Sequence, residues 1–290
     1  MKKSLIVFFL VALCSTVTFA GGPWPQPKGK GYYKLSEWWI VFDEHFTDLG
    51  LKDPNVTTGV FNTSLYAEYG ITNRLTAQFN GALFSRNTMN NLVSQTTGDI
   101  IAAGEGFNSL GDINVGLKYG LTKPGSKLPV ALSVMLGLPT GTPVAGELNN
   151  LQTGDGEFNQ IVQLDAGTGF NIGSSRSYLS AHLGFNNRTN QFSEELLFGG
   201  EFGLGLIKNK LFLVAKLNIV ESFKNGATGA AVTSTSIFAN NAESSTFGVE
   251  ANLYLTKNLG LSVGTANPFA GEIVAAGRSY SVGVFLDLSK

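Results

Sequence analysis

The chain has 290 residues, and its composition and charge limit the classes of protein to which it can belong. It contains 36 glycines and 11% aromatic residues, only 14% of its residues are charged, and its formal net charge is −1. In soluble proteins roughly a quarter of the residues are charged, and nucleic-acid-binding domains are basic, so neither class is favoured. Cys14 is the single cysteine and His45 and His182 the two histidines, which excludes a disulfide framework and a His-rich metal site. We therefore expect no metal, no cofactor and no nucleic-acid partner.

The first twenty residues, MKKSLIVFFLVALCSTVTFA, have the organisation of a secretory signal peptide. Two lysines precede an apolar run, and Thr18-Phe19-Ala20 supplies a small-x-small cleavage signal. The apolar run is too short to anchor the chain comfortably in a bilayer, and Leu13 before Cys14 does not suit a lipoprotein signal. The sequence predicts export after removal of 1–20. Residues 21–31, rich in proline and glycine, are expected to form a short periplasmic segment before a single folded domain at 32–290.

Segments of alternating polarity, joined by short turns, follow one another along this domain. In LYAEYGITNRLTAQF, Ala67 and Tyr69 share one face while Tyr66 and Glu68 share the other. A period of two is that of a β-strand, in which successive side chains point to opposite faces. Similar turns recur within 115–132, 169–183, 203–217 and 251–263. This rhythm predicts twelve strands, at 32–43, 57–70, 74–86, 111–121, 128–138, 158–170, 177–187, 195–207, 210–221, 246–256, 258–266 and 279–288.

Short turns on one side and long loops on the other are typical of outer-membrane β-barrels. After the signal peptide no run of 18 apolar residues exists, so no transmembrane helix is expected. A soluble β-sandwich or a solenoid with alternating faces is the alternative, but sandwich strands average about five to six residues, whereas these reach ten or more. We expect an all-β fold, a transmembrane antiparallel up-and-down barrel of about twelve strands in the outer membrane of a Gram-negative-type bacterium. Tyr69 and Tyr119, just before short turns, would lie at the periplasmic interface.

If the apolar face of each strand meets lipid, the polar face lines the lumen. Acids exceed bases on that face, and carboxylates favour cations in known pores; internal ion pairing that keeps the strands in register is the alternative. Glu37 is expected to add a further inward acid. The candidate pore-lining residues are Glu68, Asp112, Lys118, Asp165, His182, Glu201, Lys216, Glu250 and Asp287.

Bulky side chains and long loops could narrow the lumen. Phe84, Met135, Phe212 and Phe285 are expected to point inward, where several inward glycines leave room. The loops at 87–110 and 222–245 contain apolar stretches, which suit either a constriction inside the barrel or an extracellular cap. Ser180 and His182 are two residues apart and could suggest a membrane enzyme, but a hydrogen-bonded lumen histidine is the favoured interpretation.

Three stretches resemble the outer-membrane transporter family that is named after the meta-pathway of phenol degradation, itself distantly similar to FadL-type hydrocarbon channels. They are SLGDINVGLKY at 109–119, GLPTG at 137–141 and QTGDG at 152–156. The segment 21–31 is too short to be the plug domain of true FadL channels, and the chain ends in Leu-Ser-Lys rather than in an aromatic residue. The positions typical of the family are Gly111, Gly116, Pro139, Gly141, Gly154 and Gly156, together with Asp112 and Lys118.

The resemblance implies a barrel channel for passive uptake of small solutes, including hydrophobic or aromatic molecules, past loops 87–110 and 139–157. A closed structural barrel that presents its extracellular loops to a partner is the alternative. The expected partners are outer-membrane lipids, a small-molecule solute and the barrel assembly machinery.

Overall fold

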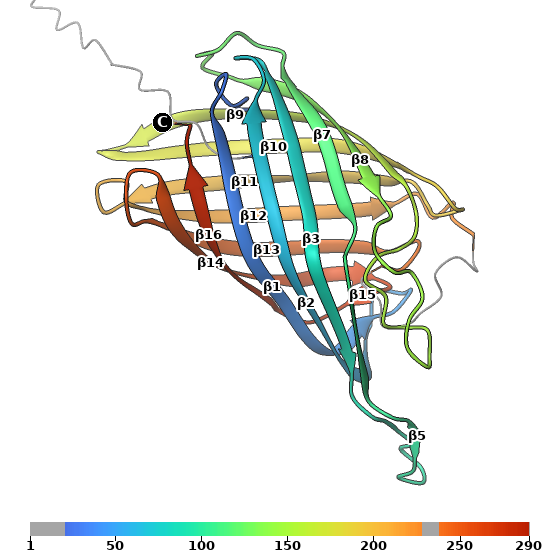
Figure 1. Cartoon of the computed structure of the whole chain (residues 1–290). Coiled ribbons are helices and arrows are strands. Elements are labelled where there is room, and N and C mark those ends of the chain that lie inside the picture. The colour runs from blue at the N-terminus through green and yellow to red at the C-terminus, as the bar shows by residue number, and fades with distance from the viewer. Residues whose placement is uncertain (1–20, 228–237, 290) are drawn as a thin grey trace, which may run out of the picture.

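A computed structural model describes residues 21–227 and 238–289 of the chain. The predicted signal peptide lies outside the described residues. The described chain is all-β, as the alternating sequence predicts (Figure 1). Within it, no helix has the length and apolar character that crossing a membrane requires.

Twelve long strands form one closed antiparallel barrel. Each strand pairs with its neighbour along the chain, and β1 closes the sheet by pairing with both β2 and β16. Tyr32 of β1 thus lies between Glu68 of β2 and Asp287 of β16. The strands are β1 (Gly31–Phe46), β2 (Lys52–Gly70), β3 (Leu75–Met89), β7 (Ile113–Gly120), β8 (Val130–Leu138), β9 (Asn159–Ile172), β10 (Ser175–Arg188), β11 (Glu195–Leu206), β12 (Leu211–Ser222), β13 (Glu243–Tyr254), β14 (Leu259–Glu272) and β16 (Ser279–Asp287).

The number and order of strands confirm the sequence prediction. Several strands run further than predicted at the end that carries the long loops; β2 starts at Lys52 rather than at residue 57, and β14 reaches Glu272 rather than residue 266. Four short elements lie at the same end: β4 (Leu92–Val93), β5 (Ile100–Ala102), β6 (Glu105–Ser109) and β15 (Val274–Ala275). The C-terminus lies at the opposite end, with the short turns (Figure 1).

The two faces of the barrel wall differ as the alternation predicts. The outward face carries exposed aliphatic and aromatic side chains such as Leu132, Leu179 and Leu183. Tyr69 and Tyr119 are exposed beside short turns, and the Arg74 guanidinium lies 5.0 Å from the ring centre of Tyr119. Apolar side chains exposed all around a closed sheet suit a lipid surrounding. The closed barrel suits it too, because every strand finds its hydrogen bonds within the sheet.

Two orientation predictions are wrong. Glu37 shares its face with exposed Leu35 and Val41, and it accepts a 2.6 Å hydrogen bond from the Thr63 hydroxyl on the outer wall. Phe84 is exposed on the outside, because a bulge shifts the register between β2 and β3 at Thr63 and Ser64. A bulge exchanges the faces of all residues beyond it.

Candidate functional site

The lumen is lined on one side by a buried charge cluster. Lys118 of β7 donates a 2.6 Å hydrogen bond from Nζ to Oε1 of Glu68 on β2, and their side chains are 1% and 0% exposed. Asp165 of β9 is 3% exposed on the same inner face. We call this side of the lumen, formed by β2, β3 and β7–β9, the buried wall.

The N-terminal segment 21–30 accounts for that burial, because it crosses the lumen at the end of the short turns. Trp24 packs edge-on against Tyr178 of β10, with ring centres 5.6 Å apart. Gln26 is fully buried; its backbone N–H donates to the Thr76 hydroxyl at 2.8 Å, and its side-chain amide donates to Glu68 at 2.8 Å. The sequence placed this segment before the barrel but did not predict that it contacts the inner face.

Glycines on the inner face allow this close approach. A Cβ atom on Gly70 would lie 2.1 Å from the carbonyl oxygen of Pro27, and one on Gly120 would lie 2.8 Å from the ring of Pro25. Within the barrel, a Cβ on Gly203 would overlap the Tyr178 ring at 1.9 Å. The inward glycines therefore make room for aromatic side chains and for the N-terminal segment.

The opposite side of the lumen remains partly accessible to solvent. Lys216 of β12 lies 3.4 Å from Glu250 of β13 and 3.7 Å from Glu201 of β11. Lys34 of β1 reaches the same Glu250 at 3.0 Å. These side chains are 15–32% exposed, and we call them the exposed wall.

An aromatic group joins the two walls at the short-turn end. Phe285 is buried and stacks on Tyr32, with ring centres 5.8 Å apart, and it meets Tyr254 edge-on at 4.9 Å. Asp287 is buried and accepts a 2.8 Å hydrogen bond from the Tyr254 hydroxyl. Phe212 and Phe285 thus point inward as predicted, and Asp287 holds an aromatic ring in place rather than facing open solvent.

At the other end of the barrel the loop at 139–158 folds inward. Leu151, Gln152 and Thr153 of this loop are buried, and the side-chain amide of Asn87 on the inner face of β3 donates to the Gln152 carbonyl. Asn150 reaches the sulfur of Met89, another inner-face residue, at 3.0 Å. This loop, and not 87–110, therefore narrows the lumen at the long-loop end.

Asp112, a family-typical position, anchors that loop and lies at its root rather than in the middle of the lumen. Its carboxylate accepts hydrogen bonds from the backbone N–H groups of Gly141 at 2.9 Å and of Asp155 at 3.1 Å. Burial raises the pKa of Asp112 to about 6, helped by the neighbouring Asp155 carboxylate. Burial also raises the pKa of Asp155 to about 6, helped by the Glu157 carboxylate. A Cβ on Gly154 would collide with Asp112 at 2.3 Å, which explains that glycine.

Arg188, at the end of β10, ties the same loop to the barrel wall. Its guanidinium contacts Glu157 at 2.6 Å, Asp155 at 3.3 Å and Glu195 of β11. The cluster fixes the C-terminal half of the loop across the lumen. Among the described residues, no group of three or more His, Cys, Asp or Glu side chains is arranged to hold a metal ion.

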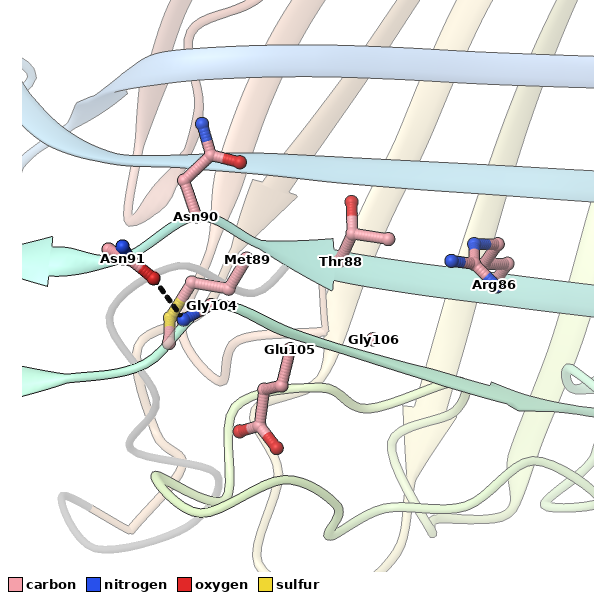
Figure 2. A pocket seen from close by; sticks show the side chains of 8 residues that line it. All are labelled: Arg86, Thr88, Met89, Asn90, Asn91, Gly104, Glu105 and Gly106. Carbon is pink, nitrogen blue, oxygen red and sulfur yellow. Dashed lines mark hydrogen bonds between the residues drawn. The ribbon is translucent and has the colours of Figure 1, made fainter.

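The segment 87–110 projects beyond the barrel as the β4–β5 hairpin (Figure 1), so of the alternatives considered for it a cap outside the lumen fits and a constriction does not. A pocket of about 710 Å³ lies at the root of this hairpin. Figure 2 shows the residues that line it, among which Glu105 points toward the neighbouring loop. Glu105 accepts the Glu147 N–H at 2.6 Å, so the pocket helps to support the inward loop.

The second candidate loop, 222–245, is described only in part. Its apolar stretch at 229–232 and Ile237 lie outside the described residues. In the part that the structure describes, Asn240 is buried and accepts the Ser193 N–H at 2.8 Å. The two flanks of this loop therefore pack on the β10–β11 connection.

The Ser180 and His182 pair shows no catalytic geometry. Both side chains are on the inner face, where His182 lies opposite Asp165 and Gly199. No hydrogen bond joins Ser180 to His182 among the described residues. A nucleophile and its base need hydrogen-bond contact, so this pair does not support a membrane enzyme.

Sequence reasoning missed two functional cations, Lys34 and Arg188. The signal for Arg188 was present, because it continues the inward alternation of Ser180 and His182. Lys34 lies in GYYKLSEWWIVF, where aromatic residues occupy both faces and the alternation gives no direction.

No protein-family model matches the chain, and no curated protein matches it either. Among solved structures, an outer-membrane channel from Pseudomonas putida F1 is 18% identical, with a TM-score of 0.57, over 93% of this chain and 99% of that one. The porins NanC and KdgM are 8% and 12% identical, with TM-scores of 0.47 and 0.41, each over 88% of this chain and over 100% and 98% of their own. The chain therefore has the fold of outer-membrane β-barrel proteins.

Proposed function

We propose that the protein is an outer-membrane channel through which small solutes pass passively. The observation that carries this proposal is the exposed wall, a strip of charged side chains on β1 and β11–β13 that remains accessible to solvent inside a closed barrel. Hydrated charges in the lumen give a solute a polar path, whereas in a barrel without a transport role they would serve only as ion pairs between strands. The likeness to the outer-membrane channel from Pseudomonas putida F1 supports the same function.

The solute class follows from how narrow this path is. The N-terminal segment occupies the short-turn end and the loop at 139–158 the other end, so only small molecules fit. The resemblance to the phenol meta-pathway transporters favours hydrophobic or aromatic solutes, and the aromatic group around Phe285 offers stacking surfaces. The partners are then outer-membrane lipids, the solute and, during insertion, the barrel assembly machinery.

The alternative is a closed barrel that presents its loops to a partner. The observation that favours it is the occupation of both ends of the lumen, together with the projecting β4–β5 hairpin (Figure 1). This protein would have the same fold but would conduct no solute.

Single-channel recording in planar bilayers separates the two functions. We would compare the mature protein from residue 21 with a variant that starts at residue 28, and a variant with a shortened β4–β5 hairpin serves as the control. A channel gives discrete steps in the mature protein, a several-fold larger conductance without 21–27, and no change in the hairpin control. If neither the mature nor the shortened protein conducts although both are folded, the channel proposal is wrong and the closed barrel is correct.

A further inference from the structure

The buried wall holds more negative than positive charge. Glu68, Asp165 and Lys118 are 0%, 3% and 1% exposed, so two carboxylates share one ammonium group away from solvent. Lys118 contacts Glu68 at 2.6 Å, whereas no ion pair joins it to Asp165 among the described residues. A buried charge without a partner is strongly unfavourable, so this cluster requires either a proton on one carboxyl group or a further cation.

The hydrogen bonds of Asp165 point to the place where this charge is missing. Oδ1 accepts a 2.9 Å bond from the Gln163 amide, while Oδ2 is buried and has no partner in the described part of the chain. The hydroxyl of Ser133, 2% exposed on the adjacent β8, likewise has no partner there. In the register of the sheet, Ser133 lies opposite Lys118 on β7 and Gln163 on β9. Asp165 is the next inward-facing residue of β9 after Gln163.

Two glutamine oxygens on the same wall are also unsatisfied. The Gln26 and Gln78 amides each donate Nε2–H to Glu68, at 2.8 Å and 3.2 Å. Because a carboxylate only accepts, these bonds fix the orientation of both amides and leave each Oε1 as an acceptor. Both Oε1 atoms are buried without a donor among the described residues. The unsatisfied groups on the described part of the buried wall are therefore oxygens, of which only the Ser133 hydroxyl can donate a hydrogen bond.

The other charged groups facing this wall do not supply the missing charge. Lys34 and Lys216 are held by Glu250 and Glu201 on the exposed wall. His182 lies directly opposite Asp165, but no hydrogen bond connects the two side chains. Lys118 is already committed to Glu68.

We propose that a small monovalent cation, Na⁺ or K⁺, binds at Oδ2 of Asp165 and the Ser133 hydroxyl, beneath the N-terminal segment. Oxygen ligands without thiolates or clustered imidazoles do not suit zinc or copper, and the excess of one carboxylate over the Lys118 ammonium group matches a single positive charge. The ion neutralises the buried wall and thereby favours the seated position of Gln26 on Glu68. This site does not depend on solute transport, since a closed barrel would need the same charge balance.

Thermal unfolding of the whole mature protein tests the site. A ligand that binds only the folded state raises its stability with concentration. We expect the unfolding midpoint to rise by several degrees when Na⁺ or K⁺ replaces N-methyl-D-glucamine at constant ionic strength. Asp165→Asn should abolish this difference. The matched control is Asp287→Asn, because Asp287 is equally buried but satisfied by Tyr254 and Ser289, and it should retain the difference.

Two results would overturn the inference. One is an unfolding midpoint of the wild type that does not distinguish the metal cations from N-methyl-D-glucamine. The other is a difference that persists unchanged in Asp165→Asn, which would place the bound cation away from Asp165. If Asp165→Asn does not fold, crystals of the wild type in Tl⁺ decide: an anomalous peak beside Asp165 Oδ2 supports the site, and its absence there refutes it.

Discussion

The two sides of the lumen carry similar charged residues in different surroundings. On the buried wall, Glu68 and Lys118 are at most 1% exposed and are covered by the N-terminal segment. On the exposed wall, Lys216 and Glu250 are 32% and 15% exposed, and each contacts more than one opposite charge. Loss of one partner of a buried ion pair is strongly destabilising, because the other charge stays buried without compensation. A solvated pair contributes only about 0–1 kcal/mol. The buried wall should therefore determine stability, and the exposed wall should determine which ions pass.

Loss of the buried ammonium group has the largest expected effect. Lys118→Met leaves Glu68 and Asp165 buried with no opposing charge among the side chains, and should lower the free energy of unfolding by about 3–5 kcal/mol. Urea unfolding of the refolded barrel in detergent measures this change. The double variant Glu68→Gln with Lys118→Met should recover part of the loss, and a single variant as stable as wild type would contradict the distinction between the walls.

The equivalent change on the exposed wall should affect selectivity instead. Lys216→Met removes the cation that faces Glu201 and Glu250, and should change the free energy of unfolding by about 1 kcal/mol or less. The lumen then carries more unpaired carboxylate, so the cation preference should increase. Reversal potentials in a salt gradient report this preference. Glu250→Gln should shift the reversal potential in the opposite direction, and no shift in either variant would show that ions do not follow this wall.

The inward loop at 139–158 should respond to pH. Asp112 and Asp155 have a pKa of about 6, above the ordinary value of 3.8, so the folded loop binds protons more tightly than the unfolded loop. Their contribution to stability is then complete below about pH 4 and is lost as the pH rises through about 6. Hydrogen exchange at Gly141 and Asp155, corrected for intrinsic rates, should be slower at pH 5 than at pH 7.5. Asp112→Asn should reduce this dependence, because only Asp155 of the pair then titrates; exchange that slows as the pH rises would contradict the assignment.

Substitution of Glu37, on the outer face of the barrel, has the smallest expected effect. Its carboxyl group faces outward among apolar side chains, and among the described residues it accepts a hydrogen bond only from Thr63. Glu37→Leu should stabilise the barrel by about 1 kcal/mol in lipid, because ionisable groups on the lipid face are unfavourable. It should leave conductance unchanged. Thr63→Val is the matched control, and it should destabilise the barrel because it removes the donor but leaves the acid.

Local alternation determined most of the architecture. It predicted twelve strands, their order and the direction of most side chains, because the period of two is a property of each strand alone. Inward positions such as Glu68, Lys118 and Asp165 follow from it directly. The prediction was wrong for Phe84 and Glu37, where a bulge and an aromatic-rich strand remove the local signal.

Only the tertiary structure decided how the lumen is filled. Trp24, Pro25 and Gln26 precede the first strand and carry no periodic pattern, yet they meet residues from β2, β3, β7, β9 and β10 across the barrel. Likewise, the loop at 139–158 folds inward because Asp112 and Arg188, distant from it in sequence, satisfy its backbone and its acids. Such contacts form between segments that meet only after the sheet has closed, so the sequence determines the wall and the closed barrel decides what occupies it.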